Sequence, residues 1–331
     1  MTSSPSIEQR AETFRTTFQH VQREIHRVFV GHDALVDHAL IAFFCQGHAL
    51  IEGAPGLGKT LLVRTIANTL RLSYARVQCT PDLLPGDVTG TNILAEAQDG
   101  ARAFVFHAGP IFANIVLADE INRATPRTQS AFLEAMQEGH VTVFGTTHAL
   151  TAPFSVFATQ NPIEMEGTYA LPEAQLDRFF FKLVMPSPTT DELAEIVKRT
   201  TGVAETTAAA GIDRDAVVAM TALIREVPVA DDVLRMALRI VRATHPDADE
   251  APLSVRKYVR YGASPRAAQT LILGAKARAL LHSRYHVSRD DIRAIALAAL
   301  RHRVLLNFQA ELDRLSADTL VDDVLSTVAD H

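Results

Sequence analysis

The feature that most constrains this chain is a glycine-rich segment, GAPGLGKT, which runs from Gly53 to Thr60. It fits the phosphate-binding pattern G-x-x-x-x-G-K-[ST], in which glycines let successive backbone N–H groups point at phosphate oxygens. An apolar run at 48–51 precedes the segment and a helical stretch at 61–67 follows it, as this pattern requires. We therefore expect Lys59 to reach the β and γ phosphates of a nucleotide and Thr60 to offer its hydroxyl to Mg²⁺.

The composition is that of a chain with enough apolar residues for one large or two ordinary cores. Of its 331 residues, 47% are hydrophobic, and the net charge of −6 disfavours a surface that binds nucleic acid throughout. Cys45 and Cys79 have apolar neighbours, so we expect buried thiols and not a disulfide. The sequence lacks a signal-peptide pattern and an apolar run of ~18 residues, so we expect a cytoplasmic protein without membrane insertion.

Short apolar runs alternate with helical stretches over the first 186 residues. Their β-branched and aromatic content, without polar alternation, indicates strands that are buried on both faces of a parallel sheet. The expected strands are 49–52, 74–79, 115–118, 155–159 and 179–184. The pattern predicts an α/β domain with a parallel five-stranded sheet covered by helices.

After Pro186 the strand signals stop and helical patterns repeat. Thr189 and Glu192 fit a helix-capping box, and the further helices are expected at 213–227, 231–244, 265–283 and 289–303. We predict an N-terminal helical extension at 1–20, an α/β core at 21–186 and a smaller all-helical lid domain at 187–331.

Two segments of the predicted core fit neither a sheet strand nor a core helix. Residues 81–107 begin with a run rich in proline and glycine, and residues 139–152 alternate as a β-hairpin does, with a turn at Gly145. We expect both segments to project from the sheet.

Polar side chains stand where two of the expected strands end. Asp119 and Glu120 follow one apolar run, and Asn161 follows another. Ligands of nucleotide-binding sheets sit at the carboxyl ends of strands. We therefore expect Asp119 to help hold Mg²⁺ beside Thr60 and Glu120 to act as general base on the attacking water. The alternatives are solvated acids at a strand end and, for Asn161, an Asx turn before Pro162.

Two arginines stand at the boundaries of expected elements. Arg178 lies at the start of the last strand, and Arg266 lies in the first turn of a lid helix. A cation at a helix N-terminus opposes the helix dipole, and an anionic ligand nearby would explain it. The alternative for each arginine is a surface ion pair.

Taken together, these motifs make the chain resemble the AAA+ ATPases and, among them, the MoxR family. The resemblance extends over roughly residues 28–267. The strings that carry it are EGAPGLGKT (52–60), LADEINRA (117–124), EAMQE (134–138), ATQNP (158–162) and EGTYALPEAQLDRF (166–179).

This resemblance implies a role for each of the residues described above. Asp119 and Glu120 would form Walker B, Asn161 would be sensor 1, Arg178 an arginine finger supplied to a neighbouring subunit, and Arg266 sensor 2. Segments 81–107 and 139–152 would be the helix-2 insert and the hairpin before sensor 1. ATP with Mg²⁺ would be held by Val30 and Gly31 at the adenine and by Ala54, Pro55, Gly56, Leu57, Gly58, Lys59, Thr60 and Leu61 of Walker A and the next helix.

The resemblance also implies an activity and partners. It implies a ring-forming homo-oligomer, usually a hexamer, that hydrolyses ATP to remodel or mature client proteins together with a von Willebrand factor A domain protein. The chain departs from the family in its basic run Arg256, Lys257 and Arg260, and Arg123 and Arg127 are further candidates for the finger.

Other functions stay open at this point. A nucleic-acid motor has that basic run as its only support, and the net charge of −6 argues against nucleic acid as a partner. A metal-chelatase ATPase subunit is a further alternative, but the string at 166–179 favours the MoxR family over it. A non-catalytic scaffold would need a degraded Walker B, whereas Asp119 and Glu120 are both present. The sequence leaves open whether Arg266 acts on the nucleotide of its own subunit or of a neighbour.

Overall fold

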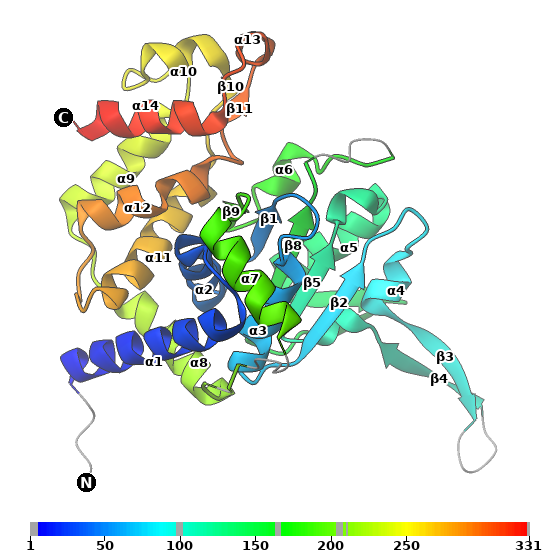
Figure 1. Cartoon of the computed structure of the whole chain (residues 1–331). Helices are drawn as coiled ribbons and strands as arrows, with labels where there is room; N and C mark the ends of the chain where they lie inside the picture. Colours follow the sequence, from blue (N-terminus) through cyan, green and yellow to red (C-terminus); the bar gives the residue numbers. More distant parts are fainter. Residues whose placement is uncertain (1–5, 97–101, 163–166, 203–207, 210, 330–331) are drawn as a thin grey trace.

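The computed structural model describes residues 6–96, 102–162, 167–202, 208–209 and 211–329. At its centre lies a parallel five-stranded sheet in the order β2-β5-β8-β1-β9, which confirms the predicted sheet (Figure 1). Phe179 donates its backbone N–H to Leu176 in a turn, so the last strand begins two residues later than expected. The strands are β1 (Ala49–Glu52), β2 (Tyr74–Gln78), β5 (Ile115–Asp119), β8 (Ser155–Gln160) and β9 (Phe181–Val184).

Helices cover both faces of this sheet, because its central strands carry apolar side chains on both. Ile51 and Leu117 belong to the core cluster of one face, whereas Leu50 and Val116 belong to that of the other. All four side chains are fully buried. The first face packs against α1 (Ile7–Val28), α2 (Asp33–Phe44) and α3 (Lys59–Thr69), and the second against α5 (Pro126–Glu138).

Helix α1 joins the N-terminal segment to the rest of the molecule. Ser6 caps it in a capping box with Gln9, and the helix then continues without a break past residue 20. Its buried face contacts α3 of the core and α11 (Pro265–Leu281) of the lid. Position 20, where the sequence predicted a boundary, therefore does not separate two structural elements.

The lid is helical, as predicted, with one exception. β10 (Val259–Tyr261) pairs antiparallel with β11 (Leu305–Leu306), and this short ladder was not expected in an all-helical lid. The helices after β9 are α7 (Thr190–Thr201), α8 (Arg214–Glu226), α9 (Asp231–Ala243), α10 (Leu253–Tyr258), α11, α12 (Arg289–Leu300), α13 (Phe308–Leu312) and α14 (Ala317–Ala329). One hydrophobic core extends from the first sheet face into the lid.

Two hairpins leave the core at the places where the sequence predicted projecting segments. The longer one projects from the body on the side away from the lid (Figure 1). The ring of Phe106 in this hairpin stacks on His148 of the other, with 3.8 Å between ring centroids. The elements are α4 (Pro85–Thr89), β3 (Gly90–Glu96) and β4 (Arg102–Ala108), then β6 (His140–Val143) and β7 (Thr146–Ala149), with a short α6 (Glu173–Leu176) before β9.

Two smaller expectations concern the cysteines and the membrane. Cys45 and Cys79 are buried and free, as expected. Within the described part of the chain, none of the helices combines the length and the apolar character needed to cross a bilayer.

Candidate nucleotide site

The phosphate-binding loop lies between β1 and α3, at the carboxyl edge of the sheet. Gly56 and Gly58 have φ values of 79° and 89°, in the left-handed region that glycine adopts at little cost. Lys59 Nζ donates to the backbone oxygens of Gly53 at 2.6 Å and Ala54 at 2.9 Å. Burial lowers the pKa of this ammonium group, while the nearby Walker B carboxylates raise it. The loop thus holds a cation at the point where the pattern predicts phosphate.

The segment expected at the adenine lies beside this loop. The Phe29 ring is so close to Gly58 that a Cβ added there would stand 3.3 Å from it. Gly31 has a φ of 71°, and a Cβ added to it would overlap Oε1 of Glu192 at 2.0 Å. Val30 and Gly31 are therefore placed between the loop and the first turn of α7.

Two oxygen ligands suited to Mg²⁺ lie side by side next to the loop. Thr60 Oγ1 donates to Asp119 Oδ2 at 3.2 Å, and Thr159 Oγ1 donates to Asp119 Oδ1 at 2.7 Å. In the chain as described, no group of three or more His, Cys, Asp or Glu side chains could hold a metal alone. Mg²⁺ is commonly bound through one or two carboxylates together with substrate phosphates, so this donor set fits it.

Glu120 follows Asp119 with its backbone in a strained conformation. Its φ of 57° lies in the left-handed region, and its N–H donates to Thr159 Oγ1 at 2.8 Å. Glu120 Oε2 accepts hydrogen bonds of 3.0 Å from both Gln78 Nε2 and Arg123 Nη1. Such strain recurs at functional sites, where the surrounding contacts hold it in place. The carboxylate is thus fixed at the mouth of the site.

Asn161 directly follows β8, which lies between the loop strand β1 and the Asp119 strand β5. The residue is buried, with 5% of its surface exposed. Its neighbour Gln160 accepts a backbone hydrogen bond of 3.3 Å from Gly53, the first residue of the loop. The structure therefore brings Asn161 to the same edge of the sheet as the loop and the carboxylates.

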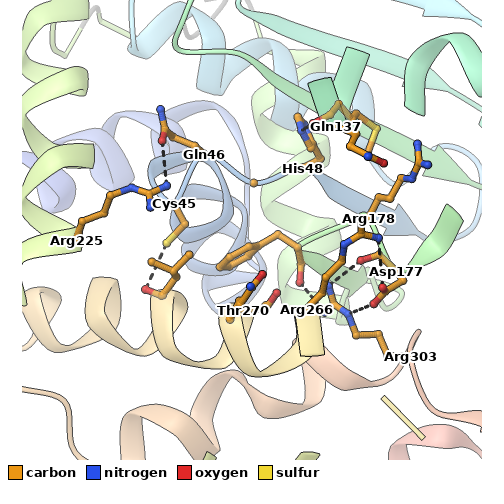
Figure 2. Close-up of a pocket in the computed structure, with 15 residues that line it drawn as sticks. Cys45, Gln46, His48, Gln137, Asp177, Arg178, Arg225, Arg266, Thr270 and Arg303 are labelled. Atoms are coloured by element: carbon orange, nitrogen blue, oxygen red, sulfur yellow. Dashed lines mark hydrogen bonds and ion pairs between the residues drawn. The ribbon is translucent and has the colours of Figure 1, made fainter. Parts of the chain in front are cut away.

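Arg178 and Arg266 do not lie at this edge. Both line one pocket of about 350 Å³, together with Gly47 and His48, which precede β1, and Phe180, which precedes β9 (Figure 2). In a parallel sheet these positions mark the amino edge. The two edges are about 13 Å apart along β1, because this strand has four residues and a strand rises roughly 3.3 Å per residue. The two arginines thus come together, but away from the loop of their own chain.

The contacts of these arginines are specific. Arg178 Nη1 donates to the backbone oxygen of Leu133 at 2.9 Å. Arg266 Nη1 lies 3.4 Å from Asp177 Oδ2, and Ser264 Oγ donates to the same carboxylate at 2.8 Å and 2.9 Å. Arg266 therefore forms an ion pair, which was the alternative interpretation of this residue. Its partner is Asp177, the residue directly before Arg178.

The basic run in the lid makes contacts within the lid. Arg256 donates to three backbone oxygens, and Lys257 Nζ lies 2.7 Å from the Tyr258 hydroxyl. The guanidinium of Arg260 lies over the ring of Tyr261, with 5.1 Å to the centroid. Each of the three cations therefore contacts residues of the lid itself.

Sequence reasoning missed four residues of the site: Arg76, Gln78, Thr159 and Asp177. Arg76 and Gln78 stand two apart in β2, so both side chains share one face, and polar residues there were a usable signal. Thr159 and Asp177 gave no comparable signal, because their partners lie far away in the sequence.

In the sheet, β8 lies between β1 and β5, and a helical lid follows the last strand. This arrangement, with a phosphate-binding loop after β1 and two carboxylates after β5, defines the class of AAA ATPases. Residues 48–181 match the "ATPase family associated with various cellular activities (AAA)", and residues 253–324 match the AAA lid domain.

Similar proteins give the family within this class. The chain is 40% identical to "Chaperone MoxR1" of Mycobacterium tuberculosis, over 92% of this chain and 80% of that protein. It is 30% identical to "Protein MoxR" of Methylorubrum extorquens, over 93% and 92% of the two chains. A solved structure of a candidate ATPase from Cytophaga hutchinsonii superposes with a TM-score of 0.90 at 37% identity, over 97% and 96% of the chains. The chain belongs to the MoxR family of AAA ATPases.

Proposed function

We propose that this protein hydrolyses ATP with Mg²⁺ as a ring-forming, chaperone-like motor that remodels client proteins. We further propose a cytoplasmic location, a hexameric ring and a partner with a von Willebrand factor A domain. The family membership and the relative named "Chaperone MoxR1" support the first part of this proposal. The remaining parts extend the resemblance seen in the sequence.

In the proposed site, the residues at the carboxyl edge of the sheet bind and orient ATP. Lys59 neutralises the β and γ phosphates, while Thr60 and Asp119 would hold the metal ion, which screens the charge of the phosphates. Glu120 accepts the proton of the attacking water, and Asn161 orients that water with its amide. Each group lies on a strand end or a helix start, so the sheet keeps their spacing fixed.

The observation that carries the ring proposal is the position of Arg178 and Arg266 at the opposite edge of the sheet. Neither guanidinium is placed to reach a nucleotide in its own loop across the length of β1. A neighbouring subunit that presents its loop to this pocket would complete both sites. We therefore propose that both arginines act on the nucleotide of the neighbour.

The two hairpins are the proposed client-contacting elements. Leu94 and Phe104 of the longer hairpin are 57% and 74% exposed, and Phe144 at the turn of the shorter one is 77% exposed. Exposed apolar side chains on projecting segments are typical of protein-binding surfaces. ATP-driven rotation of the lid against the core would move them relative to a client.

A pull-down tests the proposed function. Glu120→Gln should bind ATP and retain it, so it should trap partners, whereas Lys59→Ala is a matched control that cannot hold nucleotide. We expect a von Willebrand factor A domain protein to be enriched with Glu120→Gln in the presence of ATP only. Equal recovery with both variants would contradict a nucleotide-driven function.

A further inference from the structure

Arg76 occupies the carboxylate that is expected to bind the metal ion. Its guanidinium donates from Nε at 2.9 Å and from Nη2 at 2.7 Å to one oxygen, Asp119 Oδ2. The same oxygen accepts the hydroxyl of Thr60. The oxygen that stands beside the second expected metal ligand is therefore already bound to a cation of the chain itself.

Arg76 also connects this oxygen to the general base. Its Nη2 donates to Gln78 Oε1 at 2.6 Å, which turns the amide so that Gln78 Nε2 faces Glu120 Oε2 at 3.0 Å. A continuous chain of hydrogen bonds thus runs from Asp119 through Arg76 and Gln78 to Glu120. The two carboxylates are therefore connected through the side chains of Arg76 and Gln78.

The burial of the two partners shows which of them is able to move. The Asp119 side chain is 9% exposed, whereas that of Arg76 is 48% exposed on the edge strand β2. A carboxylate so poorly hydrated needs a positive partner. The half-exposed guanidinium can leave for solvent at little cost, and a divalent cation bound at the same oxygen would repel it.

We propose that Arg76 is a positioning residue that stands in for the metal ion. It neutralises Asp119 while metal and nucleotide are absent, and it leaves when the metal binds. Its departure removes the hydrogen bond to Gln78 Oε1, whereas Arg123 still donates to Glu120 Oε2. This inference rests on the proposed ATPase function and adds a step to it, in which the metal ion displaces Arg76 from Asp119.

The test measures metal affinity and not turnover. Mn²⁺ is titrated into the full-length protein with saturating AMP-PNP, a non-hydrolysable ATP analogue, and free Mn²⁺ is read by electron paramagnetic resonance. Arg76→Met removes the competing charge, so we expect its Mn²⁺ dissociation constant to fall about three- to tenfold. Arg76→Lys keeps the charge and should stay within about twofold of the parent.

Further variants make the result specific. Arg64→Met removes an exposed guanidinium from α3 and is the matched control for the loss of one positive charge. Asp119→Asn combined with Arg76→Met should abolish the gain in Mn²⁺ affinity, because the metal then lacks its carboxylate ligand. A thermal melt establishes that each variant is folded, and Arg76→Gln is measured as a second substitution of the same side chain.

Unchanged or weaker Mn²⁺ binding by folded Arg76→Met and Arg76→Gln would overturn the inference and leave Arg76 a structural residue. The same holds if Arg64→Met gains as much affinity as Arg76→Met. A failure of the parent protein to hydrolyse ATP is a separate outcome, which would contradict the proposed function and not the competition for Asp119.

Discussion

Asp177 Oδ1 accepts a hydrogen bond of 2.9 Å from Nε of Arg303. Asp177 directly precedes Arg178, and Arg303 belongs to the lid and is only 5% exposed. Arg303 also donates to the backbone oxygens of Asp177 at 3.1 Å and of Phe179 at 2.7 Å. The lid therefore holds the segment that carries the proposed arginine finger, and we expect a movement of the lid to shift Arg178.

These contacts predict that the two arginines bound to Asp177 differ strongly in their contribution to the free energy of unfolding. Arg303→Met should lower the free energy of unfolding by about 3 kcal/mol, because it breaks a buried ion pair and orphans several carbonyl groups. Arg266→Met removes the half-exposed partner of Asp177 and should cost less than about 1 kcal/mol. Urea denaturation of both variants gives the two values. Equal costs would mean that Arg303 does not clamp the segment.

A second prediction separates binding from hydrolysis. Lys59→Ala should lose tight ATP binding, because it removes the cation that faces the β and γ phosphates. Glu120→Gln should still bind ATP, since it keeps the loop and Asp119, but it should lose the base for water. Equilibrium nucleotide binding and phosphate release are measured on both variants. Hydrolysis by Glu120→Gln at the rate of the parent would show that Glu120 is not the base.

A third prediction concerns pH and the buried His48. Burial lowers the pKa of its imidazole to about 4, and the neutral ring accepts from Val156 N and lies 3.0 Å from the backbone oxygen of Met136. The unfolded chain binds the proton more readily, with a pKa of roughly 6.5. The contribution of His48 to the free energy of unfolding is therefore full above pH 6.5 and falls as the pH drops towards 4.

We expect His48 to contribute a loss of about 2 kcal/mol between pH 6.5 and pH 5, at roughly 1.4 kcal/mol per unit. Urea denaturation at the two pH values measures this loss. His48→Gln offers an acceptor and a donor but does not titrate. The variant should therefore lose correspondingly less stability between the two pH values. An identical pH dependence in parent and variant would show that His48 is not the titrating group.

A fourth prediction concerns assembly. If each nucleotide lies between two subunits, ATP should stabilise the ring by mass action. Light scattering of Glu120→Gln with and without ATP should show a larger particle when ATP is present. A monomer that persists with ATP at tens of micromolar protein would contradict the ring.

The fold and the residues at the carboxyl edge of the sheet could be predicted from the sequence, because both depend on local patterns. β5 and β8 are apolar on both faces, and Asp119, Glu120 and Asn161 stand directly at the ends of such strands. Their convergence follows from the parallel sheet alone. Thr60 was placed by the loop pattern and indeed contacts Asp119.

The remaining features depend on contacts between distant segments. Arg303 lies 126 residues from Asp177, so no local pattern shows their pairing. The β10–β11 ladder joins two strands of three and two residues, which are too short for a periodic signal. The position of Arg266 beside Arg178 depends on how the lid packs, and so the sequence could not place it relative to the nucleotide.

The central claim is that Arg178 acts in a neighbouring subunit. Arg178→Ala should bind ATP but hydrolyse it slowly, since arginine fingers contribute roughly 10³ to 10⁵ in rate. Lys59→Ala should be inactive because it holds no nucleotide. Neither protein alone has a complete site.

The most direct measurement is the ATPase rate of the two inactive proteins after mixing and proven co-assembly. Some interfaces will then join an intact Lys59 loop to an intact Arg178 from the neighbouring subunit. The account predicts that activity returns in proportion to the statistical frequency of these interfaces. No recovery in co-assembled rings would contradict it, and would move the finger role to Arg123 or Arg127.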